Sequence, residues 1–142
     1  MNTSSLAPAA ATLLRVALGT MFLAHSLGLK LAVFGLPATA EYFQSIELPA
    51  WSAYAVFAAE VIGGTMLVIG IQARWAALAL LPILAGATWT HAGNGWVFTA
   101  PGGGWEYPAY LGLLAVVQAM LGDGAWALRP STLPAARRPR TP

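Results

Sequence analysis

The sequence is poor in charge. Only 8% of its 142 residues are charged, whereas 58% are hydrophobic. An ordinary soluble domain carries roughly 25% charged residues, so this chain has too few of them to cover a surface that faces water. The lipid bilayer is the natural solvent for such a composition. We therefore predict an integral membrane protein in contact with lipid, rather than a soluble helical bundle rich in alanine and tryptophan.

Cysteine is absent from the sequence. This absence excludes disulfides, thiolate nucleophiles, cysteine-ligated zinc and iron–sulfur clusters. Any redox role must therefore depend on a bound cofactor or on a partner subunit. The remaining ligands are too few for a catalytic zinc site, and no nucleophile–base arrangement for hydrolysis is visible. We therefore predict no metal site.

Positive charge is concentrated near the C-terminal end. The net charge is +2, and four arginines lie in the last segment, at Arg129, Arg137, Arg138 and Arg140. Without these four, the net charge of the chain becomes 2 − 4 = −2, which argues against a nucleic-acid binder. Residues 129–142, RPSTLPAARRPRTP, are rich in proline and arginine and predict a disordered basic tail.

Four apolar segments predict the fold. They cover about residues 9–34, 51–71, 75–91 and 107–122. Each is close to the roughly 20 residues that span a hydrocarbon core, and the last is at the short end of the range. We therefore expect residues 1–128 to form one all-α domain, a bundle of four transmembrane helices.

The connections between these segments predict the orientation of the bundle. Arg74 lies in the short second connection, on the same side as the tail arginines, while the first and third connections hold no lysine or arginine. The positive-inside rule then places both termini in the cytoplasm. In the first connection, Tyr42, Phe43 and Ile46 share one side of a predicted short amphipathic helix on the outer interface.

The few ionisable residues within the apolar segments fall into two layers. At about 1.5 Å per residue, His25 and His91 both lie roughly 25 Å from the inner ends of their helices, in the outer quarter of the bilayer. Lys30 is expected to reach the outer surface, where Glu106 begins the last helix. Glu60 lies near the midplane. These positions predict an outward-opening polar pocket lined by His25, Glu60, His91 and Glu106, with Trp105 and Tyr107 at its lip.

The carboxylate of Glu60 has two interpretations. At the bilayer centre it costs on the order of 2.5–3.5 kcal/mol, so it must face the bundle interior, be protonated or have a partner. It could be a buried acid that binds a polar ligand group or carries a proton. It could equally form a structural pair with Arg15 that holds the bundle together, and the sequence does not separate the two.

The two histidines also have more than one interpretation. At matched depth, His25 and His91 could hydrogen-bond a quinone carbonyl or relay a proton, which makes them catalytic candidates together with Glu60. They could instead be helix-end side chains satisfied by backbone or water. Axial ligation of a b-type haem is a third interpretation, but two histidines alone are a weak signal for it, and quinone is the cofactor that we favour.

Several motifs follow one another in order over roughly residues 12–128. They are Arg15 and Gly19, Phe22-x-x-His25, Glu60-x-x-Gly63-Gly64, Arg74-x-Ala76, His91, and Gly104-Trp105-Glu106-Tyr107-Pro108. This ordered set resembles the DoxX family of small bacterial four-helix membrane proteins. The chain departs from it after the first histidine, where many relatives have glycine in place of Ser26 and a lysine one position nearer than Lys30.

The resemblance implies a role in membrane redox chemistry. DoxD-like relatives are described as subunits of a thiosulfate:quinone oxidoreductase, and others as membrane partners of sulfur-transfer and superoxide-detoxifying enzymes. We therefore expect a quinone-interacting or redox-associated subunit, an oxidoreductase subunit if it is an enzyme, with a partner that carries any sulfur chemistry. The alternatives are a non-catalytic scaffold that docks a partner, and a small carrier that would need a homo-oligomer.

Overall fold

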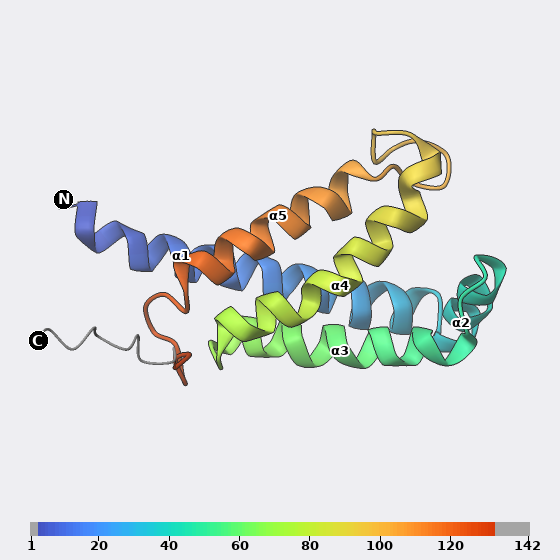
Figure 1. Ribbon diagram of the computed structural model, residues 1–142. Coiled ribbons are helices and arrows are strands. Elements are labelled where there is room, and N and C mark those ends of the chain that lie inside the picture. Colours follow the sequence, from blue (N-terminus) through green and yellow to red (C-terminus); the bar gives the residue numbers. More distant parts are fainter. Residues whose placement is uncertain (1–2, 133–142) are drawn as a thin grey trace, which may run out of the picture.

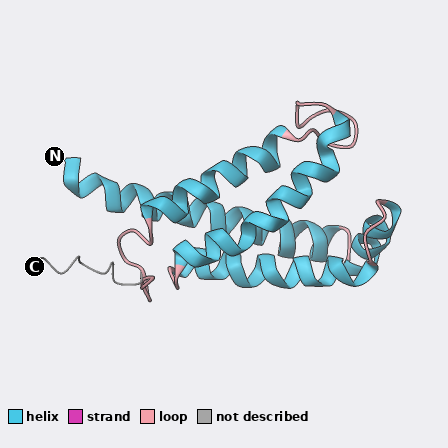
Figure 2. Ribbon diagram, viewed as in Figure 1, coloured by secondary structure: helices cyan, strands magenta, loops and turns pink. Residues whose placement is uncertain are grey.

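The computed structural model describes residues 3–132, and every regular element within them is helical (Figure 2). The elements follow in the order α1 Thr3–Leu23, η1 Ala24–Val33, α2 Leu36–Ser45, α3 Ala50–Ile69, α4 Ala73–His91, η2 Ala92–Asn94 and α5 Glu106–Leu121. η1 is a π-helix and η2 a short 3₁₀ turn. The prediction of an all-α fold is confirmed.

Three helical stretches are long and apolar enough to cross a membrane: Leu6–Val33, Ala50–Ile69 and Ala73–Asn94. α5 is apolar as well but has only 16 residues. It is therefore about 24 Å long, against a hydrocarbon core of about 30 Å. The chain is a multi-pass membrane protein whose last long helix is shorter than the others.

The long helices run back and forth between two ends of the molecule (Figure 1). The start of α1, the α3–α4 connection and the segment after α5 lie at one end, which we call the terminal end. α2 and the loop of residues 92–105 lie at the other end, which we call the loop end. α1 packs chiefly against α3, and α4 packs chiefly against α5.

Small residues let the helices approach one another closely. A β-carbon on Gly19 of α1 would stand 2.6 Å from the carbonyl oxygen of Gly64 on α3, so these two backbones are in direct contact. A β-carbon on Gly63 would stand 2.8 Å from the Leu80 side chain of α4. Close packing through small residues is the usual way in which helices associate in lipid, and Leu67 and Leu80 fill the core around it.

The segment Ala24–Val33 departs from α-helical winding. It forms a ten-residue π-helix, and the Phe34 N–H after it still bonds to the Leu29 carbonyl, five residues back. π-Helices occur mostly as single-turn bulges and often at functional sites. The segment contains no proline and consists largely of good α-helix formers. Contacts with other helices, rather than local propensity, therefore select this winding.

α2 covers much of the segment predicted to be an amphipathic helix. Thr39 and Ala40 are buried against the bundle, while Tyr42 is about half exposed. An apolar aromatic side chain thus points away from the bundle, as a helix that lies in a membrane interface requires.

Residues 122–131 close the terminal end. The Leu128 N–H bonds to the Ile69 carbonyl, and the Gln72 N–H bonds to the Arg129 carbonyl. The predicted basic tail begins at Arg129, which the structure places within this hydrogen-bonded segment. The part of that tail from residue 133 onward lies outside the described residues.

Candidate functional site

The buried carboxylate of α3 pairs with a lysine of the π-helix. Lys30 Nζ lies 2.5 Å from Glu60 Oε2, and the two side chains are only 18% and 6% exposed. No other ion pair occurs within residues 3–132. The prediction that Lys30 extends to the outer surface is therefore wrong. Lys30 of the π-helix faces Glu60 of α3 instead, and this pairing offsets the cost of a lone carboxylate inside the membrane.

Arg15, the partner that the sequence offered for Glu60, is used elsewhere. Its side chain is buried, and the guanidinium donates hydrogen bonds of 3.1–3.4 Å to four carbonyls, those of Leu67, Val68, Ala125 and Trp126. The first two belong to the last turn of α3, where carbonyls lack intrahelical partners and carry the negative end of the helix dipole. The predicted pair between Arg15 and Glu60 is therefore wrong, because Arg15 caps α3 instead.

His25 lies in the first turn of the π-helix and contacts α5. Its Nδ1 lies 3.1 Å from the Met21 carbonyl, and its ring stacks on that of Tyr107, with centroids 6.0 Å apart and planes at 26°. The Tyr107 hydroxyl in turn donates to the Met21 sulfur at 2.7 Å. Because a carbonyl can only accept, this contact requires a proton on Nδ1.

His91 holds the loop that follows α4. Its Nδ1 lies 3.0 and 3.1 Å from the carbonyls of Gly102 and Gly103, and Asn94 Nδ2 donates to the same two carbonyls at 2.9 Å. Both glycines have a left-handed backbone, with φ of +80° and +78°, which glycine adopts without steric cost. In the described part of the chain, no hydrogen bond or ion pair joins His91 to another predicted site residue.

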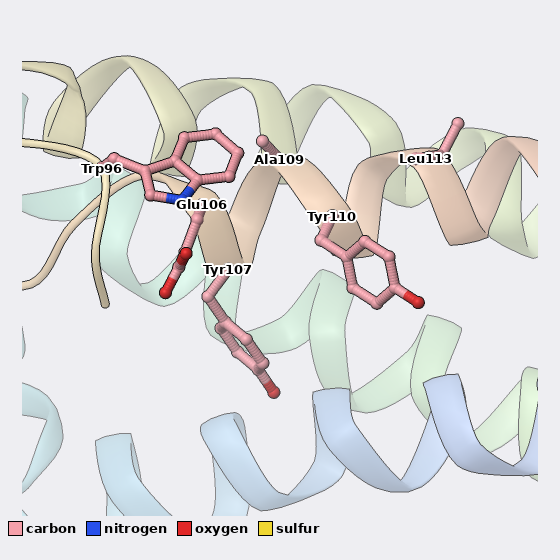
Figure 3. A pocket seen from close by; sticks show the side chains of 6 residues that line it. All are labelled: Trp96, Glu106, Tyr107, Ala109, Tyr110 and Leu113. Carbon is pink, nitrogen blue, oxygen red and sulfur yellow. The ribbon is translucent and has the colours of Figure 1, made fainter. Parts of the chain in front are cut away.

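A cleft opens beside the first turns of α5. Its volume is about 470 Å³, and it is lined by Trp96, Glu106, Tyr107, Ala109, Tyr110 and Leu113 (Figure 3). The Glu106 carboxylate and the Tyr107 ring point to the same side of α5 (Figure 3). Glu106 Oε1 accepts a hydrogen bond of 2.9 Å from the Phe98 N–H, which fastens the loop to the helix. We call this the aromatic cleft; its volume is typical of small-molecule sites.

A second cleft, of about 640 Å³, lies between α4 and α5, and Trp89 and Trp105 are among its apolar lining residues. Trp105 therefore faces this second cleft and not the aromatic cleft. Its ring meets the Trp96 ring edge to face, with centroids 4.5 Å apart. Such aromatic pairs add about 0.5–1.5 kcal/mol beyond simple burial, so Trp105 helps to hold Trp96 in place.

Comparison with known proteins places the chain in a family. Residues 10–93, more than half of the chain, match the family model described as DoxX. The chain belongs to the DoxX family. The matched stretch contains His25, Lys30, Glu60 and His91, whereas α5 and all six lining residues of the aromatic cleft lie beyond it.

The DoxX-family chain is also similar to a Bacillus subtilis (strain 168) protein named "Putative oxidoreductase CatD". The two are 36% identical over 75 residues, which cover 53% of this chain and 54% of that protein. The chain thus spans about half the length of the curated relative that it matches. No solved protein structure matches it at a significant level.

In this DoxX-family protein the predicted site residues occupy three places. Glu60 pairs with Lys30 between α3 and the π-helix. His25 stacks on Tyr107 beside the aromatic cleft, which Glu106 also lines. His91 and Trp105 support the loop at residues 92–105. The sequence analysis missed Trp96 and Tyr110 as lining residues. Tyr110 could have been found, since it follows Tyr107 by one helical turn on the same face.

Proposed function

We propose that this DoxX-family membrane protein is a quinone-interacting subunit of a membrane redox system. The observation that carries the proposal is the aromatic cleft, an apolar recess with one carboxylate at the loop end of a membrane helix. A quinone, when bound, supplies two-electron, two-proton redox chemistry. The similar Bacillus subtilis protein has the word oxidoreductase in its name, which favours a redox role for this chain as well.

The lining of the aromatic cleft suits a flat apolar ring with polar edges. Trp96 and Tyr110 are 56% and 59% exposed and offer aromatic faces on which a ring can stack. Glu106 uses Oε1 for the Phe98 N–H, which leaves Oε2 to accept a hydrogen bond from a hydroxyl of the reduced quinone, the quinol. Leu113 continues the apolar wall along α5, in the direction that a lipid-soluble tail would follow.

The other candidate residues have supporting roles in this proposal. His25 lies behind Tyr107, so a titratable ring stands next to the cleft wall and could exchange protons with a ligand. Glu60 would handle protons farther inside the bundle, together with Lys30. His91 would act as a positioning residue, because it holds the loop that carries Trp96 over the cleft.

Mass spectrometry of an organic extract of the detergent-purified protein tests the proposal. A mock membrane preparation gives the background. We expect about one quinone per chain in the wild type, strong loss of quinone in Trp96→Ala, and retention in Trp89→Ala. The second variant is a matched control, because Trp89 is an exposed tryptophan that lines the other cleft.

Two results would contradict a quinone site in the aromatic cleft. One is a wild-type extract that contains phospholipid alone. The other is equal quinone retention by Trp96→Ala and Trp89→Ala. In either case the histidines and Glu60 would be interpreted as structural residues.

The exposed loop favours a second function, that of a scaffold that docks a partner protein. Trp96, Val97 and Phe98 are 56%, 49% and 62% exposed at the loop end. If the loop docks a partner, Val97→Ser with Phe98→Ser should abolish co-purification of that protein while the quinone content stays the same. Loss of quinone without loss of a partner would favour the redox function alone.

We also infer that the terminal end faces the cytoplasm of a bacterial cell, because arginines lie at that end. Because the sequence contains no cysteine, a thiol reagent labels this protein only at an introduced cysteine. A cysteine introduced by Phe98→Cys should react with a membrane-impermeant thiol reagent in spheroplasts, whereas Leu128→Cys should react only after lysis. The reverse pattern would invert the orientation.

A further inference from the structure

We propose that the terminal end carries a binding surface for anionic phospholipid head groups. The surface consists of Trp126, Leu128, Arg129 and Arg74, and we call it the tryptophan rim. The proposed ligand is a phospholipid of the adjoining leaflet, bound through its phosphate by arginine and through its acyl region by the two apolar side chains. The proposal does not depend on quinone binding.

The apolar part of the tryptophan rim is uncovered. Trp126 is 84% exposed, the highest value among the large apolar side chains of the described residues, and Leu128 is 72% exposed. Both belong to the segment after α5, which lies at the terminal end of the molecule (Figure 1), where a membrane surface would be. Tryptophan concentrates at this depth because its ring is amphipathic.

Hydrogen bonds from side chains of α1 hold the backbone at Trp126. Trp126 has a left-handed backbone, with φ of +54°, which is uncommon for a residue other than glycine and stores strain. The carbonyls of Ala125 and Trp126 accept hydrogen bonds from the buried Arg15, and the Thr12 hydroxyl donates to the Ala125 carbonyl at 2.7 Å. A buried network therefore maintains the conformation in which the indole is exposed.

The two arginines of the tryptophan rim differ in exposure: Arg129 is exposed, whereas Arg74 is half-buried and its Nε is buried without a hydrogen-bond partner among the described residues. Arg74 and Arg129 form no ion pair with any described residue. Arg74 lies in the first turn of α4, where the helix dipole disfavours a cation. Asp123 is the only acidic residue between positions 122 and 132. Its carboxylate accepts hydrogen bonds from the amides of Ala73 and Ser131 and from the Ser131 hydroxyl.

Charge distinguishes this end from the other. The loop end carries Glu41, Glu47 and Glu106, and the one lysine of the sequence is paired with Glu60 inside the bundle. An anionic leaflet attracts arginine near its surface and repels carboxylates. Only the terminal end is therefore complementary to anionic lipid.

Native mass spectrometry of the full chain tests the proposal. The protein is purified from mixed phosphatidylcholine and phosphatidylglycerol vesicles, and the lipid that remains bound is counted. We expect the wild type to retain phosphatidylglycerol selectively. Each arginine near an anionic surface contributes about fivefold in affinity. Arg74→Gln with Arg129→Gln should therefore bind phosphatidylglycerol about thirtyfold more weakly, and Arg74→Lys with Arg129→Lys should restore most of the binding.

The tail provides the control, because Arg137, Arg138 and Arg140 carry three positive charges that do not belong to the tryptophan rim, one more than the rim variant removes. Changing these three to glutamine should leave the selective binding in place. The proposal is overturned if the tail variant loses the lipid and the rim variant keeps it. Equal retention of both lipids by the wild type, or a co-purified protein that depends on Trp126, would also overturn it.

If a rim variant fails to fold, quenching of tryptophan fluorescence still tests the proposal. Brominated acyl chains quench nearby indoles, and the difference between wild type and Trp126→Phe isolates the contribution of Trp126. We expect that contribution to be strongly quenched in vesicles that contain phosphatidylglycerol. Fluorescence from Trp126 that stays unquenched in such vesicles would place this side chain in water and contradict the proposal.

Discussion

The two ends of the molecule are closed by different means. At the terminal end, buried or half-buried polar side chains, Arg15 and Asp123 above all, hold backbone groups from several segments. At the loop end, residues 92–105 are held by His91, Asn94 and aromatic contacts, and much of this loop is exposed. Ligand-binding segments tend to come from the less stable parts of a fold. The comparison thus associates the terminal end with rigidity and the loop end with the cleft proposed to bind quinone.

The largest change in stability is expected for the Lys30–Glu60 ion pair, which belongs to neither end. Lys30→Met or Glu60→Met alone should lower the free energy of unfolding by about 3–5 kcal/mol, because each leaves an unpaired buried charge. The double variant should recover most of that loss. Unfolding in detergent micelles, analysed as a double-mutant cycle, measures the coupling. Simple additivity of the two single changes would show that the pair contributes little.

At the terminal end, Arg15→Gln should cost about 3 kcal/mol, because four carbonyls lose charged donors. Hydrogen exchange should accelerate at the amides of Leu128 and Arg129, which depend on the closed segment. The exchange of the loop at residues 92–105 should not change, and it serves as the internal control. Faster exchange at both ends would mean that the two ends are not independent.

At the loop end, Gly104→Ala should cost about 1–3 kcal/mol through overpacking. A β-carbon there would stand 2.1 Å from the Val97 carbonyl oxygen and 2.5 Å from that of Trp96. Near-ultraviolet circular dichroism should report a disturbed pair of tryptophans. Gly93→Ala is the matched control, since a β-carbon at Gly93 meets nothing within 4 Å. Similar spectra for the two variants would contradict the packing described for Gly104.

The smallest effect is expected for His91→Ala. It removes about 1 kcal/mol, because Asn94 still donates to both glycine carbonyls. Hydrogen exchange in residues 95–105 should rise while the free energy of unfolding changes little. A loss of stability comparable to that of Arg15→Gln would mean that the loop end is as rigid as the terminal end.

Hydropathy was sufficient to predict the helices, because a run of apolar residues near 20 has few alternatives in a membrane protein. The π winding of Ala24–Val33 could not be predicted, since its residues favour an α-helix when considered alone. The position expected for Lys30 assumed α-helical winding throughout this segment. A helix of 3.6 residues per turn would place Lys30 about 140° around the axis from His25, and a wider turn changes that angle.

The polar contacts were harder to predict than the helices. Arg15 and Glu60 are opposite charges on adjacent helices, but each has a nearer partner that sequence patterns do not reveal. For Arg15 this partner is a group of backbone carbonyls, and backbone groups leave no signature in the sequence. Trp105 was expected beside Tyr107, but residues two apart at the start of a helix lie about 200° apart around its axis and face different sides.

The hydrogen bonds of Arg15 also have a consequence for biogenesis. Two of its acceptors, the carbonyls of Ala125 and Trp126, lie more than 100 residues later in the chain. A chain is synthesised from its N-terminus, so α1, α3 and α4 are made before these acceptors exist. During that interval a buried cation has only the α3 carbonyls as partners. Synthesis of residues 122–131, after α5, therefore supplies the remaining hydrogen-bond acceptors for the Arg15 side chain of α1.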